Sequence, residues 1–210
     1  MIFLAPASYA QARIWLDEQI RFDSEKPQMA IYNMPFLYRL TSQHTFIITQ
    51  LQQALQQVII KHQSLHTSLI FDKDTNVLMQ RIIDLNDNNN ISFTFIESTF
   101  EIDEQLNDIM HDEKGNSQLF NLSQGLVFRC HIIYYKEICS NDLLTDKDAI
   151  IFNFHHALFD FPSMNVFLHD LNHAFITNQL TSDDDTALRY LDCKYNYFLL
   201  FSLYIVSFII

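Results

Sequence analysis

The chain is poor in glycine. Among its 210 residues, only Gly115 and Gly125 are glycines. Loops that hold phosphate groups need several closely spaced glycines, in patterns such as GxGxxG or GxxxxGK. Two separated glycines can form neither pattern, so the sequence excludes the common nucleotide-binding loops.

Cysteines and basic residues are also few. Cys130, Cys139 and Cys193 have no CxxC spacing, and their odd number favours a reducing compartment over secretion. The 13 lysines and arginines stand against 25 aspartates and glutamates, which gives a formal net charge of -12. Without a basic stripe the chain cannot displace counterions from a phosphate backbone, so we expect no nucleic-acid partner.

The two ends of the chain also lack targeting features. Residues 1–6 have no basic region and no long apolar core, so they do not form a signal peptide, and we expect a cytoplasmic protein. Residues 197–210 carry no charge. As a helix this stretch would span about 21 Å, less than the roughly 30 Å hydrocarbon core of a membrane. It is interpreted as a short membrane anchor, as a buried element, or as a stretch that was not selected as part of the fold.

Apolar residues are plentiful. Hydrophobic residues make up 49% of the chain, with 19 phenylalanines, which is enough for the core of one domain or one large lobe. Helical and strand periodicities alternate along the chain, which predicts a layered α/β sandwich. The expected helices are 12–22, 45–62, 101–113 and one that begins near Pro162. The expected strands are 29–40, 65–71, 77–83, 91–96, 126–135 and 148–154.

Three local patterns refine this prediction. Ser8 and Gln11 have the spacing of a capping box at the start of a helix. Pro35 within the strand 29–40 indicates an edge strand or an interruption. The polar turn at 72–76 separates two short strands and predicts a hairpin.

The strongest candidate site follows the apolar strand 148–154. His155 and His156 are adjacent there, and Asp160 comes four positions after His156. Because neighbouring strand residues point to opposite faces, one histidine should face a channel and the other should pack inward. An imidazole that faces a channel could accept a proton or hold a nucleophile. A metal site and two core histidines are the alternative interpretations.

Four segments resemble motifs of one family. Residues 8–15 resemble SxAQxRxW, residues 61–69 resemble RHExLRTxF, and residues 155–163 resemble HHxxxDGxS. Residues 120–129 resemble the segment before the strand that leads to the site. In this order they are similar to the condensation domains of nonribosomal peptide synthetases, which belong to the chloramphenicol acetyltransferase-like superfamily.

This resemblance implies a fold and a function. The fold would be the layered α/β sandwich of chloramphenicol acetyltransferase. The reaction would join two carrier-bound thioesters into an amide, and His156 would position or deprotonate the attacking amine. His155 and Asp160 would be mainly structural. The lobe itself would bind no metal and no cofactor, because the substrates would ride on phosphopantetheine arms of partner carrier (thiolation) domains.

The chain departs from the family motifs near the site. Phe161 stands where the family has glycine, and His66 stands where it has an arginine that is expected to brace Asp160. Arg13 and Ser163 match their motif positions. The resemblance gives these four residues a role in supporting the site or its substrate channel, and the two departures predict a narrowed loop and a weaker charge partner for Asp160.

The resemblance covers residues 1–192, which would be the N-terminal lobe of a truncated condensation domain. Residues 193–210 match no part of the family pattern. A missing C-terminal lobe would then be a partner, and the isolated chain would be inactive and could self-associate through the exposed face. The alternatives are a non-catalytic remnant or binding protein, and a fragment of a coenzyme A-dependent acyltransferase.

Overall fold

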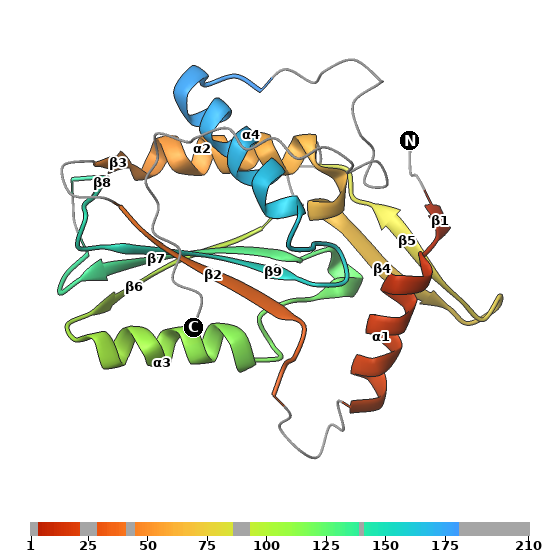
Figure 1. Cartoon of the computed structure of the whole chain (residues 1–210). Helices are drawn as coiled ribbons and strands as arrows, with labels where there is room; N and C mark the ends of the chain where they lie inside the picture. Colours follow the sequence, from red (N-terminus) through yellow and green to blue (C-terminus); the bar gives the residue numbers. More distant parts are fainter. Residues whose placement is uncertain (1–3, 22–28, 41–44, 86–92, 139–140, 181–210) are drawn as a thin grey trace.

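The computed structural model describes residues 4–21, 29–40, 45–85, 93–138 and 141–180. The predicted tail 193–210 lies outside these ranges. Figure 1 shows the described elements, in which helices cover both faces of a twisted sheet and a smaller sheet lies at one end.

The central sheet has four strands in the order β2-β9-β7-β6. Strand β9 (Ala149–His155) is antiparallel to both β2 (Asn33–Arg39) and β7 (Phe128–Tyr135), whereas β6 (Thr94–Phe100) is parallel to β7. Every residue of β9 is buried, so the candidate site begins where the innermost segment of the chain ends.

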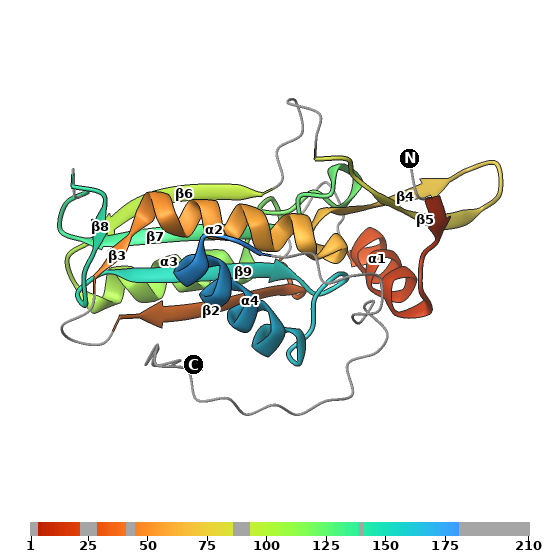
Figure 2. The ribbon, with the colours of Figure 1, turned by 90° about the horizontal axis from the view of Figure 1, so that it is seen from above.

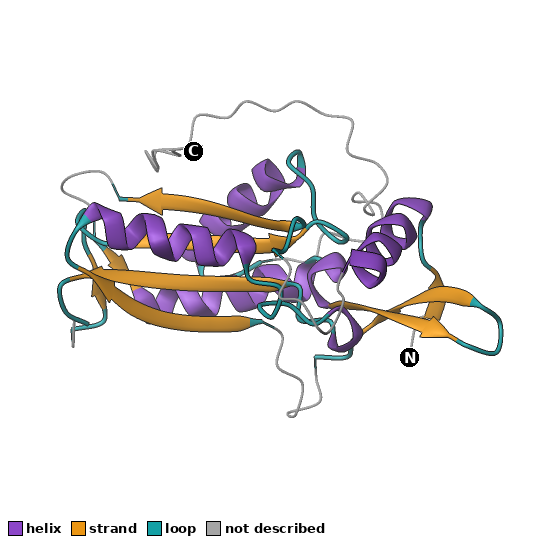
Figure 3. Ribbon diagram, turned by 90° about the horizontal axis from the view of Figure 1, so that it is seen from below, coloured by secondary structure: helices purple, strands orange, loops and turns teal. Residues whose placement is uncertain are grey.

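Helices pack on both faces of this sheet. Helix α2 (Ile48–Lys61) and helix α4 (Ser163–Thr177) lie on one face, and helix α3 (Asp103–Gly115) covers the other (Figures 2 and 3). The side chains of β9 alternate between them. Phe152 and Phe154 join the main core with α2 and α4, whereas Ile151 packs in a separate cluster with Leu106 of α3.

A second sheet has the order β1-β5-β4 and is antiparallel throughout. It contains β1 (Leu4–Pro6), β4 (Thr67–Asp72) and β5 (Val77–Ile82), and helix α1 (Tyr9–Arg21) packs beside it. Ile14 of α1 contacts Leu69 and Leu78 of this sheet and Leu158 of the histidine turn in one apolar cluster. The smallest sheet pairs β3 (Phe46–Ile47) with β8 (Leu143–Leu144). Two short 3-10 helices, η1 (Gln63–His66) and η2 (Leu122–Gln124), complete the described fold.

The predicted layered α/β fold is confirmed, together with its local patterns. Ser8 and Gln11 form the reciprocal capping box, since each side chain bonds to the backbone N–H of the other at 3.2 and 2.7 Å. Pro35 lies in β2, at the edge of the central sheet. The hairpin β4–β5 turns where it was predicted.

Several element boundaries were wrong for identifiable reasons. Residues 29–32 do not extend β2, because its partner β9 ends at His155, which pairs with Asn33. Strand β6 extends to Phe100 because its polar residues find partners, as in the 2.6 Å hydrogen bond from Tyr134 to Glu97. Strand β8 was missed, since no strand was predicted between residues 135 and 148.

The described part of the chain contains no helix long and apolar enough to cross a membrane.

Candidate active site

The turn with the two histidines joins β9 to α4, and hydrogen bonds on both sides fix its backbone. The N–H of His155 donates to the carbonyl of Val127 at 2.9 Å, and the N–H of His156 donates to the carbonyl of Tyr32 at 2.9 Å. Strand β7 follows Val127 and β2 follows Tyr32, so the strands on both sides of β9 hold this turn. The N–H of Leu158 closes it by donating to the carbonyl of His155 at 3.0 Å.

His155 packs inward and is 3% exposed. Its Nε2 lies 2.8 Å from Oε1 of Glu18 on α1, and its Nδ1 accepts the N–H of Ala157 at 3.2 Å. Because Nδ1 accepts, the proton of the neutral ring lies on Nε2 and is donated to Glu18. One histidine of the pair therefore packs inward, as the strand pattern predicted.

His156 faces the other way and is exposed. Its Nδ1 lies 3.0 Å from the carbonyl oxygen of Phe159. A carbonyl only accepts hydrogen bonds, so Nδ1 carries the proton and Nε2 of the neutral ring has a free lone pair. The two adjacent imidazoles thus have opposite tautomers, and only that of His156 offers an exposed proton acceptor. The alternative of two core histidines is wrong.

Asp160 binds the first residue of the helix that follows the turn. Its Oδ1 accepts the backbone N–H of Ser163 at 3.0 Å and also the Ser163 hydroxyl. The same N–H also donates to the backbone carbonyl of Asp160 at 3.1 Å, and a carboxylate near the start of a helix is favoured by the helix dipole. Asp160 and Ser163 therefore fix where α4 begins.

His66 does not approach Asp160 in the way that the family arginine was expected to do. It is 7% exposed in η1, and its Nδ1 donates to the carbonyl of Ile83 at 2.8 Å. Burial lowers the pKa of His66, so the ring is neutral at physiological pH. Among the described residues, Asp160 makes no ion pair, and its hydrogen bonds go to Ser163.

Phe161 and Arg13 lie at the surface. Phe161 is 60% exposed, and its ring meets that of Phe36 edge-on, with the centroids 5.3 Å apart. The backbone of Phe161 is outside the left-handed region, so the loop does not need glycine's conformational freedom there. Arg13 lies on the exposed side of α1. Within the described residues, neither side chain makes a hydrogen bond to the two histidines of the turn.

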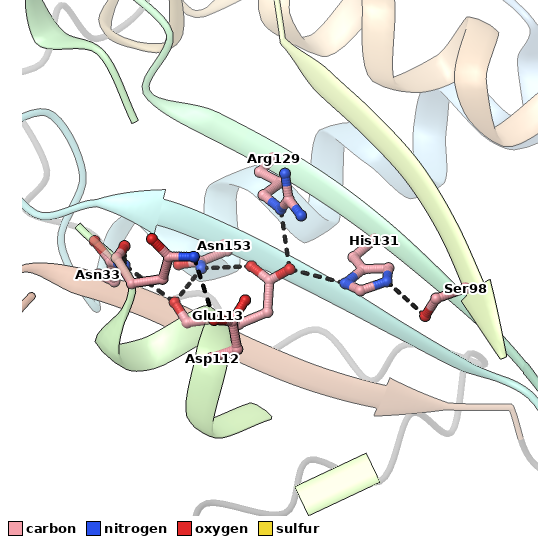
Figure 4. A network of polar contacts seen from close by, with 8 residues as sticks. Asn33, Ser98, Asp112, Glu113, Arg129, His131 and Asn153 are labelled. Atoms are coloured by element: carbon pink, nitrogen blue, oxygen red, sulfur yellow. Dashed lines mark hydrogen bonds and ion pairs between the residues drawn. The ribbon is translucent and has the colours of Figure 1, made fainter. Parts of the chain in front are cut away.

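A buried polar cluster lies behind the site, on the face of the sheet covered by α3 (Figure 4). At its centre is Glu113, which is 1% exposed. Its carboxylate accepts hydrogen bonds from Nε of Arg129 at 2.9 Å, Nδ1 of His131 at 2.8 Å and Nδ2 of Asn153 at 2.8 Å. Nε2 of His131 in turn lies 2.8 Å from the hydroxyl of Ser98. The cluster connects α3 to three strands of the central sheet.

The sequence reasoning missed this cluster, although a signal for it was present. Arg129 and His131 are two positions apart, and so are Asn153 and His155, so each pair lies on one face of its strand. Glu113 lies seven positions after Leu106, on the inward side of α3. The periodicity that placed the apolar residues therefore also predicts which polar residues are buried together.

No group of three or more histidine, cysteine, aspartate or glutamate side chains in the described ranges is placed to hold a metal ion.

Comparison with protein families identifies the chain. A family model described as "Condensation domain" matches residues 4–193. The chain belongs to the condensation domain family. Its described strands and helices are therefore those of a condensation domain, and the histidine turn lies within the matched region.

Relatives and solved structures agree with this assignment. Over 194 residues the chain is 27% identical to the hybrid PKS-NRPS synthetase apdA of Emericella nidulans, covering 91% of this chain. The starter condensation domain of rhizomide synthetase RzmA superposes with a TM-score of 0.61 at 19% identity over 82% of this chain. The condensation domain of the monacolin K polyketide synthase MokA superposes with a TM-score of 0.63 at 14% identity over 86%. These structures show that the fold is that of a condensation domain.

The chain spans only a small part of these proteins. It corresponds to 4% of the synthetase apdA, and to 37% and 36% of the two solved chains.

Proposed function

We propose that the chain supplies the histidine side of an amide-forming condensation site that acts on carrier-bound aminoacyl or peptidyl thioesters. The observation that supports this most directly is the exposure and the hydrogen bonding of the His156 ring. It is an exposed imidazole at the end of a buried strand, with Nδ1 held by Phe159 and Nε2 available.

The proposed reaction uses His156 as a proton acceptor. The acceptor amine attacks the donor carbonyl, a C–N bond forms and the C–S bond breaks. Nε2 of His156 takes the proton that the amine nitrogen loses, and the departing thiolate then receives it. His155 and Asp160 act through the turn, since one anchors it to α1 and the other starts α4.

The substrate class rests on analogy with a relative. A mutant of the RzmA starter condensation domain has been crystallised in complex with C8-CoA and Leu-SNAC, an acyl thioester and an aminoacyl thioester. We infer the same pair of classes here, with phosphopantetheine-bound substrates delivered by carrier domains. The C8-CoA complex also supports a second candidate, in which the donor is a coenzyme A thioester and the chain is a fragment of a coenzyme A-dependent acyltransferase.

We also infer that residues 1–192 correspond to an N-terminal lobe and need a second lobe for activity. The 37% coverage of the RzmA chain supports this inference. So do large apolar side chains at the surface, such as Tyr9 at 87%, Ile20 at 73% and Phe161 at 60% exposed. Without a partner lobe we expect the chain to self-associate, and a monomer in light scattering would contradict this.

The activity test combines the purified chain with a C-terminal lobe from a relative. Acyl and aminoacyl thioesters of N-acetylcysteamine, coenzyme A and loaded carrier proteins serve as substrates, and mass spectrometry detects the amide. We expect His156→Ala to lower the rate by about 100-fold or more, which is the usual contribution of a general base. His173→Ala, which removes an exposed histidine of α4, serves as the control.

The result distinguishes the candidates. Turnover with carrier-bound donors supports the condensation function, and turnover with coenzyme A donors alone supports the second candidate. Amide formation that is equal in His156→Ala and wild type would overturn both. No product from any substrate, with a complex of the two lobes confirmed by light scattering, would favour a non-catalytic remnant.

A further inference from the structure

Tyr32 contacts the histidine turn in two ways. It lies directly before β2, and its backbone carbonyl accepts the N–H of His156 at 2.9 Å. Its ring lies beside both imidazoles, with centroid distances of 6.3 Å to His156 and 6.4 Å to His155. The ring is inclined by only 29° to that of His156, so the two rings are stacked, and by 47° to that of His155.

The hydroxyl of Tyr32 is anchored on α1. It donates to Oδ2 of Asp17 at 2.8 Å, and Asp17 also accepts Nε of Arg21 at 2.7 Å. The hydrogen bond from Tyr32 is the largest of the effects that hold the pKa of Asp17 below its ordinary range. Asp17 is therefore ionised at neutral pH, and the bond to Tyr32 is charge-assisted.

Consecutive carboxylates of α1 thus reach both histidines. Glu18 bonds directly to His155, and Asp17 reaches His156 through Tyr32. The two histidines differ in how much they depend on this support. His155 is buried and has few other positions to occupy, whereas the exposed side chain of His156 is free to change rotamer unless a neighbour limits it.

We propose that Tyr32, anchored by Asp17, is a positioning residue that holds the His156 ring with Nδ1–H on the Phe159 carbonyl and Nε2 unprotonated. Its meaning for catalysis rests on the proposed function. The structural part does not, because the tautomer of His156 is a property of the chain alone. Tyr32 stacks against the face of the His156 ring, and its hydrogen bond to Asp17 on α1 keeps Tyr32 itself from turning away.

The test measures the tautomer of His156 directly. Two-dimensional 1H–15N NMR of imidazole nitrogens in the full chain, at about pH 8 and so above the ordinary histidine pKa of about 6.5, distinguishes the Nδ1–H form from the Nε2–H form. His156→Gln assigns the signals. We expect the Nδ1–H form to dominate in wild type. Tyr32→Leu should lower its ratio to the Nε2–H form about three- to tenfold, as expected when one neutral hydrogen bond is weakened.

Two further variants separate positioning from folding. Tyr32→Phe keeps the ring and loses the anchor, so we expect a smaller shift of the ratio in a chain that still folds. Tyr9→Leu removes a tyrosine of α1 that is 87% exposed, and should leave the ratio unchanged. An unchanged ratio in Tyr32→Phe and in folded Tyr32→Leu would overturn the proposal. If Tyr32→Leu does not fold, the ratio in Tyr32→Phe alone decides.

The outcome is distinct from that of the activity test. A shifted tautomer in a chain that forms no amide with any second lobe would support the role of Tyr32 and contradict the proposed function. Amide formation by the wild type, together with an unchanged tautomer ratio in the Tyr32 variants, would support the proposed function and contradict the role of Tyr32.

Discussion

Removing the Glu113 carboxylate should strongly destabilise the fold. In Glu113→Ala, Arg129 and His131 lose their shared acceptor in a site where their side chains are 14% and 7% exposed. Removing one partner of a buried ion pair costs about 3–5 kcal/mol, because the remaining charge stays buried without compensation. For a domain of this size that corresponds to a fall in melting temperature of about 6–20 °C.

Glu113→Gln should cost less, about 1–3 kcal/mol, since neutral hydrogen bonds replace charge-assisted ones. The amide must also meet Nδ2 of Asn153, which already donates to the backbone carbonyl of Glu113 at 2.7 Å. If the amide oxygen of the new glutamine accepts from Arg129 and His131, its NH2 group faces Nδ2 of Asn153, which is also a donor. Rotating Asn153 by half a turn would relieve this clash and lose the bond to the carbonyl, so neither arrangement satisfies every group.

The pH dependence follows from the pKa of Glu113. Burial alone would raise that pKa, but the hydrogen bonds from His131 and Asn153 and the charge of Arg129 outweigh burial and lower it. A carboxylate with a lowered pKa contributes stability above its ordinary pKa of about 4.3, and loses it as the pH falls through the folded value. The advantage of wild type over Glu113→Gln should therefore be constant near neutral pH and shrink below about pH 4.

Urea unfolding followed by circular dichroism measures these differences. The control is Asp108→Asn, which removes an exposed carboxylate of the same helix and should change the free energy of unfolding by less than about 0.5 kcal/mol. If Glu113→Ala matched this control, or if the loss in Glu113→Gln grew in acid, the assigned role of the cluster would be wrong.

Four other substitutions have defined outcomes in the same unfolding assay. Asp170→Asn weakens the bonds of a buried carboxylate to Lys61, the last residue of α2, and to His62 directly after it, and should cost about 1–3 kcal/mol. An unchanged free energy of unfolding would show that α2 and α4 pack together without these bonds. Gly125→Ala should cost about 1–3 kcal/mol, because φ is 70° and the added Cβ would lie 2.3 Å from Cδ1 of Ile83. In Gly115→Ala the added Cβ meets only the side chains of Met29 and His111, which can shift, so the change should stay within about 0.5 kcal/mol. Equal effects at both glycines would contradict the backbone argument. Asp160→Ala removes the carboxylate that accepts hydrogen bonds from Ser163 at the start of α4 and should cost about 1 kcal/mol, and a neutral result would show that these bonds are dispensable.

The layered α/β fold and the opposite orientations of His155 and His156 could be predicted from the sequence. Both follow from periodicity, since a strand alternates its side chains and β9 continues this alternation to its last residue. Strand ends were harder to predict, because they depend on the partner. The end of β9 sets where β2 begins, and no local signal in residues 29–32 shows this.

The supporting contacts of the site could not be read from the sequence for a similar reason. Glu18 and Tyr32 are far from the histidines along the chain, and only the packing of α1 and the register of β2 bring them there. The cluster around Glu113 was different. Its polar residues follow the same periodicity as the apolar ones, but they are few within the largely apolar sequences of β7 and β9.

The two departures from the family motifs leave the hydrogen bonds of the histidine turn in place. Asp160 is supported by the start of α4, where the N–H and hydroxyl of Ser163 and the helix dipole stabilise its charge without an arginine. His66 is neutral and bonded to Ile83, so it leaves no buried charge unpaired. Neither change disturbs the hydrogen bond between His156 and Phe159. Under the proposed function, the tautomer of His156 therefore matters more than how closely positions 66 and 161 match the motif.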